Sequence, residues 1–198
     1  ADLISAFAAN GSGITGLGNE AINVSSGTAS TAQAKTLAAA TTGIVTATIA
    51  DGDMATLAGL NESGHAYAIT ITDNSVAASA LNSLNGKTTV AIDGSAITTL
   101  TGSAADLNTA YTSAGINGLG NENLTLSDSS LNASLLNALD GRTSGTINAA
   151  SINTLTGSAA DLISAFAANG SGITGLGNEA VNVSSGTANT AQAKTLAA

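Results

Sequence analysis

The two ends of this chain carry almost the same sequence. Residues 1–29 return at 160–188 with one change, from Ile22 to Val181, and the match extends to Ala39 and Ala198. Shorter echoes lie between them: LTGSAADL occurs at 100–107 and 155–162, and GLGNE occurs at 16–20, 118–122 and 175–179, with a degenerate copy, GLNE, at 59–62. Self-similarity of this kind is the signature of a repeat architecture. We therefore predict one continuous array over residues 1–198, with units of roughly 47–57 residues at 2–52, 53–105, 106–160 and 161–198, the last one partial. Because both ends match, we expect the array to be a piece of a longer periodic chain or fibre.

Each unit contains two segments with the composition of short β-strands. The first alternates strictly between apolar and polar residues, which is typical of a half-buried strand. It occurs at 22–25, 69–72, 124–127 and 181–184. The second is shorter and β-rich, at 43–50, 88–94 and 144–150. The pattern predicts about seven short strands.

A helix is predicted between the two strands of each unit. In the segment 127–141 a single apolar stripe is formed by Leu131, Leu135, Leu136 and Leu139. Asp128 or Ser129 is expected to cap its start, and Gly141 to end it. The equivalent segments are 72–86 and the Ala-rich 28–43.

A shared spacing follows the second strand and predicts a tight helical turn. It reads Met54…Leu57…Gly59, then Ile97…Leu100…Gly102, then Ile152…Leu155…Gly157. In two units a further helix follows, because Ser103 with Asp106 and Ser158 with Asp161 resemble a capping box. Residues 2–9 are the same helix, and the shorter unit lacks it at 53–66.

A strand, a helix and a further strand in regular succession favour parallel pairing with right-handed crossovers. Repeats of this length stack so that each coil contacts only its neighbours. The predicted fold is a right-handed α/β solenoid, with one parallel sheet on one face and a layer of short helices on the other. An all-β solenoid is the alternative, and the leucine stripe at 131–139 argues against it.

Composition limits the classes of function. Hydrophobic residues make up 43% of the chain but aromatic residues only 2%, so the core must be thin and built from small side chains. A formal net charge of −9 argues against nucleic-acid and anionic-membrane partners. No apolar run approaches the ~18 residues of a transmembrane helix, and no signal peptide is recognisable in this window. The absence of Cys excludes disulfides and thiol chemistry.

Few residues offer chemistry. His65 is the single histidine and has no repeat equivalent, so we expect a loop or surface role. Two series of acids recur in register, and they predict either a column of cation sites or helix capping by Asp and loop hydrogen bonding by Glu. The second interpretation is favoured because equivalent carboxylates two coils apart would lie roughly 10 Å from one another. The series are Asp2, Asp106 and Asp161, and Glu20, Glu62, Glu122 and Glu179.

Other motifs also have structural explanations. Asp51 and Asp53 in ADGDM form the best isolated calcium candidate, but turn and N-cap roles are favoured because the other oxygen ligands of a calcium loop are missing. GLGNE precedes a strand, which is the wrong order for a dinucleotide fingerprint. Outward Thr residues at 70, 72 and 125 suggest ice binding, but Asn occupies the equivalent positions 23 and 182. We assign no catalytic, cofactor-binding or metal-binding residue and expect no cofactor.

A longer phrase carries a resemblance. The segment LTLSDSSLNASLLNALDGRTSGTINAASINTLTGSAADL resembles the long Ala/Thr/Ser-rich arrays of giant bacterial cell-surface and secreted proteins, including those of marine cyanobacteria. This resemblance implies an extracellular or cell-surface location and a structural or adhesive role. We expect a non-catalytic segment of a filament, fibre or adhesin stalk, whose partner is itself through end-to-end stacking or chain continuation. The alternative is a calcium-, ice- or glycan-binding surface on the same scaffold.

Overall fold

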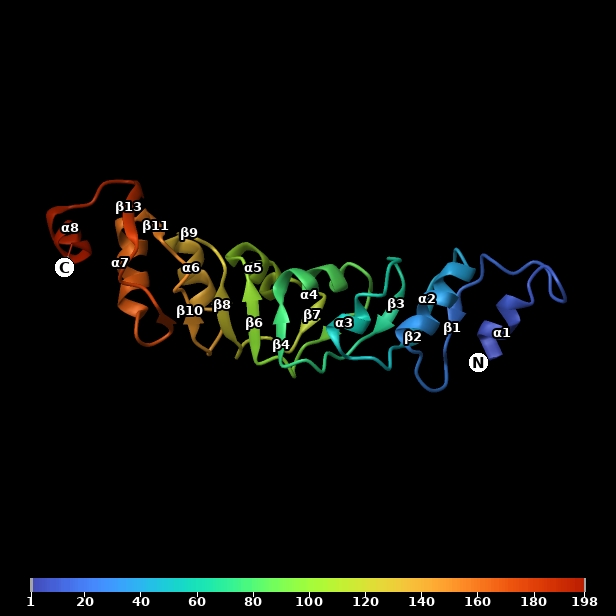
Figure 1. Cartoon of the computed structure of the whole chain (residues 1–198). Helices are drawn as coiled ribbons and strands as arrows, with labels where there is room; N and C mark the ends of the chain where they lie inside the picture. The colour runs from blue at the N-terminus through green and yellow to red at the C-terminus, as the bar shows by residue number, and fades with distance from the viewer. Residues whose placement is uncertain (1, 198) are drawn as a thin grey trace. The chain divides into compact units, whose positions relative to one another are not determined.

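Short helices and short strands alternate along the chain in the order that the repeat pattern requires. The structure, a computed structural model, describes residues 2–197, within which there are eight helices and thirteen strands (Figure 1). The helices are α1 (Asp2–Ala8), α2 (Thr31–Ala40), α3 (Met54–Leu57), α4 (Ala78–Asn85), α5 (Ala104–Thr112), α6 (Ala133–Asp140), α7 (Ala159–Ala168) and α8 (Thr190–Leu196). The strands are β1 (Ile22–Asn23), β2 (Val45–Thr48), β3 (Ala66–Ala68), β4 (Ser75–Ala77), β5 (Ile92–Asp93), β6 (Thr99–Gly102), β7 (Ile116–Asn117), β8 (Asn123–Leu126), β9 (Ser130–Asn132), β10 (Ile147–Asn148), β11 (Thr154–Ser158), β12 (Ile173–Thr174) and β13 (Ala180–Ser185).

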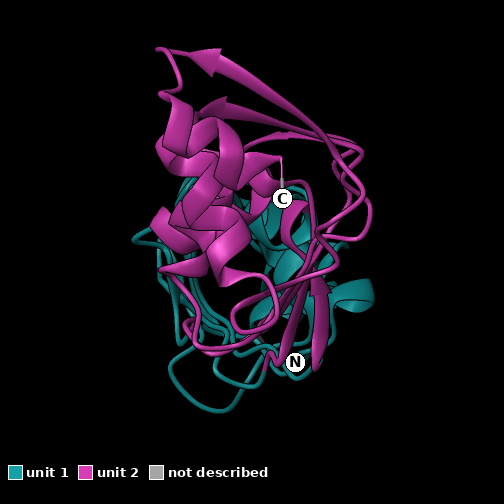
Figure 2. Cartoon of the chain, turned by 90° about the vertical axis from the view of Figure 1, so that its left-hand side faces the viewer, with its two compact units in different colours: residues 1–73, 80–96, 113–118 teal, residues 74–79, 97–112, 119–198 magenta. Residues whose placement is uncertain are grey.

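All strand pairs within the described residues are parallel, and they join residues 20 to 27 positions apart in the chain. The strands form four small open sheets, with the orders β1-β2-β3, β12-β10-β8-β6-β4, β13-β11-β9 and β5-β7. The chain is therefore a mixed α/β protein with parallel sheets, as the repeat pattern predicts. It divides into two compact units: unit 1 holds residues 1–73, 80–96 and 113–118, and unit 2 holds residues 74–79, 97–112 and 119–198 (Figure 2).

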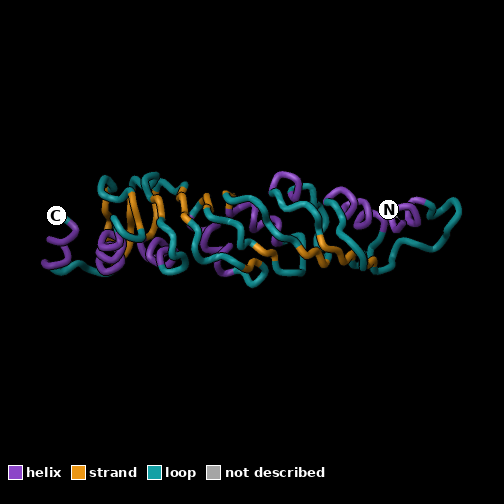
Figure 3. Tube along the Cα trace, turned by 90° about the horizontal axis from the view of Figure 1, so that it is seen from below, coloured by secondary structure: helices purple, strands orange, loops and turns teal. Residues whose placement is uncertain are grey.

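Unit 2 contains the most regular packing. The pairings of its five-stranded sheet align one buried apolar residue from each strand in a single column, and successive members are 23 to 26 residues apart: Val76, Leu100, Leu124, Ile147 and Ile173. The helices α5, α6, α7 and α8 contact one another in chain order, beside the strands (Figures 2 and 3). Each helix fills the interior with small and branched side chains, such as Ala133, Leu136 and Leu139 of α6.

Unit 1 repeats this arrangement over shorter sheets. Ile22 of β1 pairs with Val45 of β2, and Ala47 of β2 pairs with Tyr67 of β3, so that all four side chains are buried in one layer. α2 packs against β2 and against α1. Its N-terminus carries a complete capping box between Ser30 and Gln33.

The predicted single sheet of about seven strands is wrong. The segments at 97–102 and 152–157, predicted as helical turns, form strands β6 and β11 instead, and only residues 54–57 adopt the expected helical turn, as α3. Residues 69–72 form no strand: Thr70 makes only an isolated bridge with Asp93. A Thr-Leu-Thr triplet has β-propensity, and it lies directly before a helix N-cap, so periodicity alone hid the strands.

Two helices begin later than predicted. Val76 and Leu131, taken as the first members of helical stripes, lie in β4 and β9. Leu131 is paired with Leu155 on the neighbouring strand and is buried there, so pairing overrides helix propensity at this position. α6 starts at Ala133 with Asn132 as its N-cap, not with Asp128 or Ser129.

Candidate functional site: the recurrent acidic turns

The GLGNE segments, here called the acidic turns, share one local geometry. In each, the Glu carboxylate accepts a hydrogen bond from the backbone N–H two residues earlier. The distances are 2.6 Å from Gly18 to Glu20, 2.9 Å from Gly120 to Glu122 and 2.7 Å from Gly177 to Glu179. The donor glycine has a positive φ, +145° at Gly120, which residues with a side chain rarely adopt. This hydrogen bond lowers the pKa of Glu20.

The next coil fastens onto the acidic turn. The Thr143 hydroxyl donates to the Glu122 carbonyl at 2.6 Å, and the Ser144 N–H donates to the Gly120 carbonyl at 2.9 Å. Gly145 lies so close to the Glu122 carbonyl that a Cβ would collide with it. The first copy repeats these contacts through Thr41, Thr42 and Gly43 on residues 18–20. The acidic turn is therefore a structural joint between coils.

Glu122 differs from its equivalents because it is fully buried. Its carboxylate also accepts a hydrogen bond of 2.6 Å from the Tyr111 hydroxyl on α5. Burial, followed by the hydrogen bond to this carboxylate, raises the pKa of Tyr111 above its ordinary value. A buried carboxylate with two donors is a stabilising element, whereas the same carboxylate without them would be costly.

The second series of acids caps helices, as the favoured interpretation predicted. Asp106 and Asp161 complete capping boxes with Ser103 and Ser158, whose hydroxyls receive the Asp backbone N–H at 3.1 Å. Asp53 caps α3 through the Thr56 N–H at 2.8 Å, which lowers the pKa of Asp53. The Asp2 side chain lies outside what the structure describes. Within residues 2–197 no group of three or more His, Cys, Asp or Glu residues is placed to hold a metal ion.

A further set of caps acts between coils, and sequence reasoning missed it. An Asp carboxylate that follows one strand accepts the N–H of the first residue of a helix 19 to 24 positions earlier, at 2.7 Å in each case. The pairs are Asp51 with Thr31, Asp73 with Met54, and Asp128 with Ala104. A negative charge there also favours the helix dipole. The constant offset between helix start and Asp was the available signal.

Replacing Asp128 with Ala should therefore destabilise α5 of the preceding coil instead of its own helix α6. We expect a loss of about 1 kcal/mol, because one helix N-terminal N–H loses its charged acceptor. Amide hydrogen exchange resolved by residue would show faster exchange in α5. Asp128→Asn, which keeps an acceptor oxygen, is the matched control and should retain most of the protection; equal loss in α6 would contradict this assignment.

His65 is buried, so its expected surface position is wrong. Its Nδ1 accepts the Val45 N–H at 3.1 Å, and its ring lies 5.4 Å from the ring of Tyr67. The imidazole thus takes the place of a backbone acceptor between β2 and the next coil. Tyr67 is almost fully buried, and desolvation raises its pKa to about 12.

Alkaline pH should unfold this protein before it reaches the pKa of the folded tyrosines. Because Tyr67 and Tyr111 have folded-state pKa values above the ordinary 10.0, the unfolded chain ionises first. The stability they contribute is complete below pH 10 and is lost as pH rises towards about 12. Thermal melting between pH 8 and 11.5 measures this. The double variant Tyr67→Phe/Tyr111→Phe should be flatter with pH; an unchanged slope would contradict the assignment.

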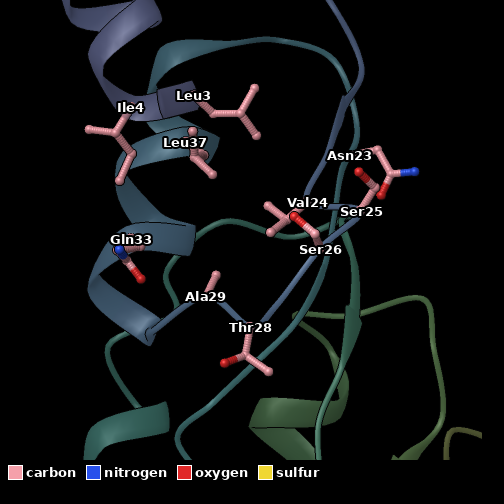
Figure 4. Close-up of a pocket in the computed structure, with 10 residues that line it drawn as sticks. All are labelled: Leu3, Ile4, Asn23, Val24, Ser25, Ser26, Thr28, Ala29, Gln33 and Leu37. Atoms are coloured by element: carbon pink, nitrogen blue, oxygen red, sulfur yellow. The ribbon is translucent and has the colours of Figure 1, made fainter. Parts of the chain in front are cut away.

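Two hollows lie within unit 1. The larger, about 340 Å³, is bounded by Leu3 and Ile4 of α1, Val24 and Leu37 of α2, together with Ser and Asn side chains (Figure 4). No ionisable side chain lines it. The second, about 290 Å³, is lined by Leu57, Leu60 and Leu84, with Lys87 at the edge, where α3 spans only four residues.

The outward face of the unit 2 sheet carries a mixed polar column. Its pairings align Ala77, Thr101, Thr125, Asn148 and Thr174. Threonine is therefore interrupted by Asn and Ala, as the sequence indicated.

No protein-family model, curated protein or solved structure matches this chain. Among residues 2–197 no helix is long enough to cross a bilayer, since the longest have ten residues.

Proposed function

We propose that the chain is a right-handed α/β solenoid that serves as a non-catalytic structural segment of a long extracellular or cell-surface filament, fibre or adhesin stalk. The observation that carries this proposal is the column Val76, Leu100, Leu124, Ile147 and Ile173 in unit 2. Five parallel strands at nearly constant chain spacing are what stacking of successive coils produces.

The polar contacts support the same role. The acidic turns and the inter-coil caps use their carboxylates to join each coil to the next, through Glu20, Glu122, Asp51, Asp73 and Asp128. These groups stabilise the stack locally, so coils can be added without redesigning a distant core. A stalk needs this property. The resemblance to Ala/Thr/Ser-rich arrays of bacterial surface proteins adds the location to the proposal.

Electron microscopy of the purified 198-residue chain tests the proposed shape. We expect elongated particles of uniform width, whereas round compact particles would contradict the solenoid. Force spectroscopy tests the mechanical role, because pulling should remove one coil at a time, in steps of roughly 80–90 Å for coils of about 24 residues. A single cooperative rupture of the whole chain would contradict neighbour-only stacking.

A further inference from the structure

The repeated end segments, residues 1–39 and 160–198, are covered on opposite faces. They differ at two positions, Ile22 against Val181 and Ser30 against Asn189. A comparison of their burial is therefore a comparison of one sequence in two surroundings. Any difference between them reports what packs against each copy.

The second copy is open on the side that faces later coils. Ile22 is 3% exposed but its equivalent Val181 is 36% exposed. Ala34 is buried in α2, whereas Ala193 in α8 is exposed, and α8 buries none of its residues. In the first copy this side is covered by residues 44–51, through β1–β2 pairing, the Ala29–Ile49 bridge and the Asp51 cap.

The first copy is open on the side that faces earlier coils. Leu3 and Ile14 are each 38% exposed, while their equivalents Leu162 and Ile173 are fully buried. In the second copy β10 and β11 supply that cover, through their pairing with β12 and β13. The hollow in Figure 4 lies on this side of the first copy, bounded by Leu3 and Val24.

We propose that residues 160–198 of one chain replace residues 1–39 of a second chain against its residues 44–51, joining copies head to tail. This proposal rests on the proposed stacking of coils. The incoming segment fits because it is the same segment, and both versions form a capping box at the helix start, with Ser30 or Asn189 as the N-cap. It also arrives already covered by its own β10 and β11, so neither open side remains at the junction.

The exchange depends on concentration. Residues 1–39 are tethered to the acceptor coil, which favours the internal arrangement in dilute solution. The exchanged arrangement buries Val181 and Ala193, and it releases a segment that regains conformational entropy. High protein concentration or mild warming should therefore drive head-to-tail assembly.

The register of the new strand pair gives a direct test. Asn23 pairs with Thr46, and both side chains are exposed. Asn182 is the equivalent of Asn23, so exchange would place it beside Thr46 of another copy, about 5 Å away between neighbouring strands. Because the chain has no Cys, the full-length variant Thr46→Cys/Asn182→Cys can be treated with a short bismaleimide and separated by denaturing electrophoresis.

We expect a ladder of covalent dimers and higher multimers. Thr46→Cys/Asn23→Cys should give internal cross-links only, and Asn182→Cys alone should give at most dimers. Adding Ala193→Glu should abolish the ladder without changing the monomer fold, because Ala193 is exposed there. A ladder that survives Ala193→Glu, or monomers under conditions where the Asn23 pair reacts, would overturn the exchange. Elongated particles without a ladder would sink this inference alone and leave the proposed function standing.

Discussion

Glu122→Ala should destabilise the protein by about 3 kcal/mol, a large fraction of the stability of a typical domain. The carboxylate is fully buried and accepts from the Gly120 N–H and the Tyr111 hydroxyl. Removing it leaves two donors without their acceptor and a space where the side chain lay. Denaturant unfolding followed by far-ultraviolet circular dichroism measures the loss.

The repeat supplies a matched control for this result. Glu179 makes the same bond to Gly177 but is only partly buried, and Phe166 stands where the first helix has Tyr111. Glu179→Ala should therefore cost less than about 1 kcal/mol. Tyr111→Phe converts one site towards the other and should cost about 1 kcal/mol. Equal losses for Glu122→Ala and Glu179→Ala would show that burial of the acidic turn contributes nothing.

Ala34→Glu should cost several kcal/mol, whereas Ala193→Glu should change stability by less than about 0.5 kcal/mol. The two alanines occupy the same position of the repeated helix, so helix propensity cancels between them. Ala34 is completely buried by the following coil, and a glutamate there would place a charge in the apolar layer without a partner. Ala193 is exposed. Urea unfolding at low protein concentration separates the two effects.

A large loss from Ala193→Glu would contradict the one-sided cover of the second repeat copy. A small loss from Ala34→Glu would contradict the packing of residues 44–51 on α2. In either case the stacking of coils at the two ends would need a different description.

The helices with strong capping signals could be predicted from sequence. Ser158 and Asp161 mark the start of α7, and the same pair marks α5, because a capping box satisfies helix N–H groups locally. Alternating segments such as 124–126 and 181–184 also fall in strands, β8 and β13. Signals that depend on residues close together in the chain were readable.

Features set by contacts between coils were not readable. Strands β6 and β11 are defined by partners about 24 residues away, and a Thr-Leu-Thr triplet does not show which partner it has. The burial of Glu122 depends on Tyr111 and Thr143, whereas the Glu itself is the same in every copy. His65 has no repeat equivalent, and its bond to Val45 joins residues 20 positions apart.

The most direct test of stacking along one axis is small-angle X-ray scattering on two lengths of the array. Because residues 160–198 repeat 1–39, a chain that continues from residue 198 into a second copy of 40–198 adds one whole period without a seam. We expect the longer chain to have the same cross-sectional radius of gyration as the 198-residue chain, and a maximum dimension that grows in proportion to the added coils. A cross-section that thickens with chain length would contradict the solenoid.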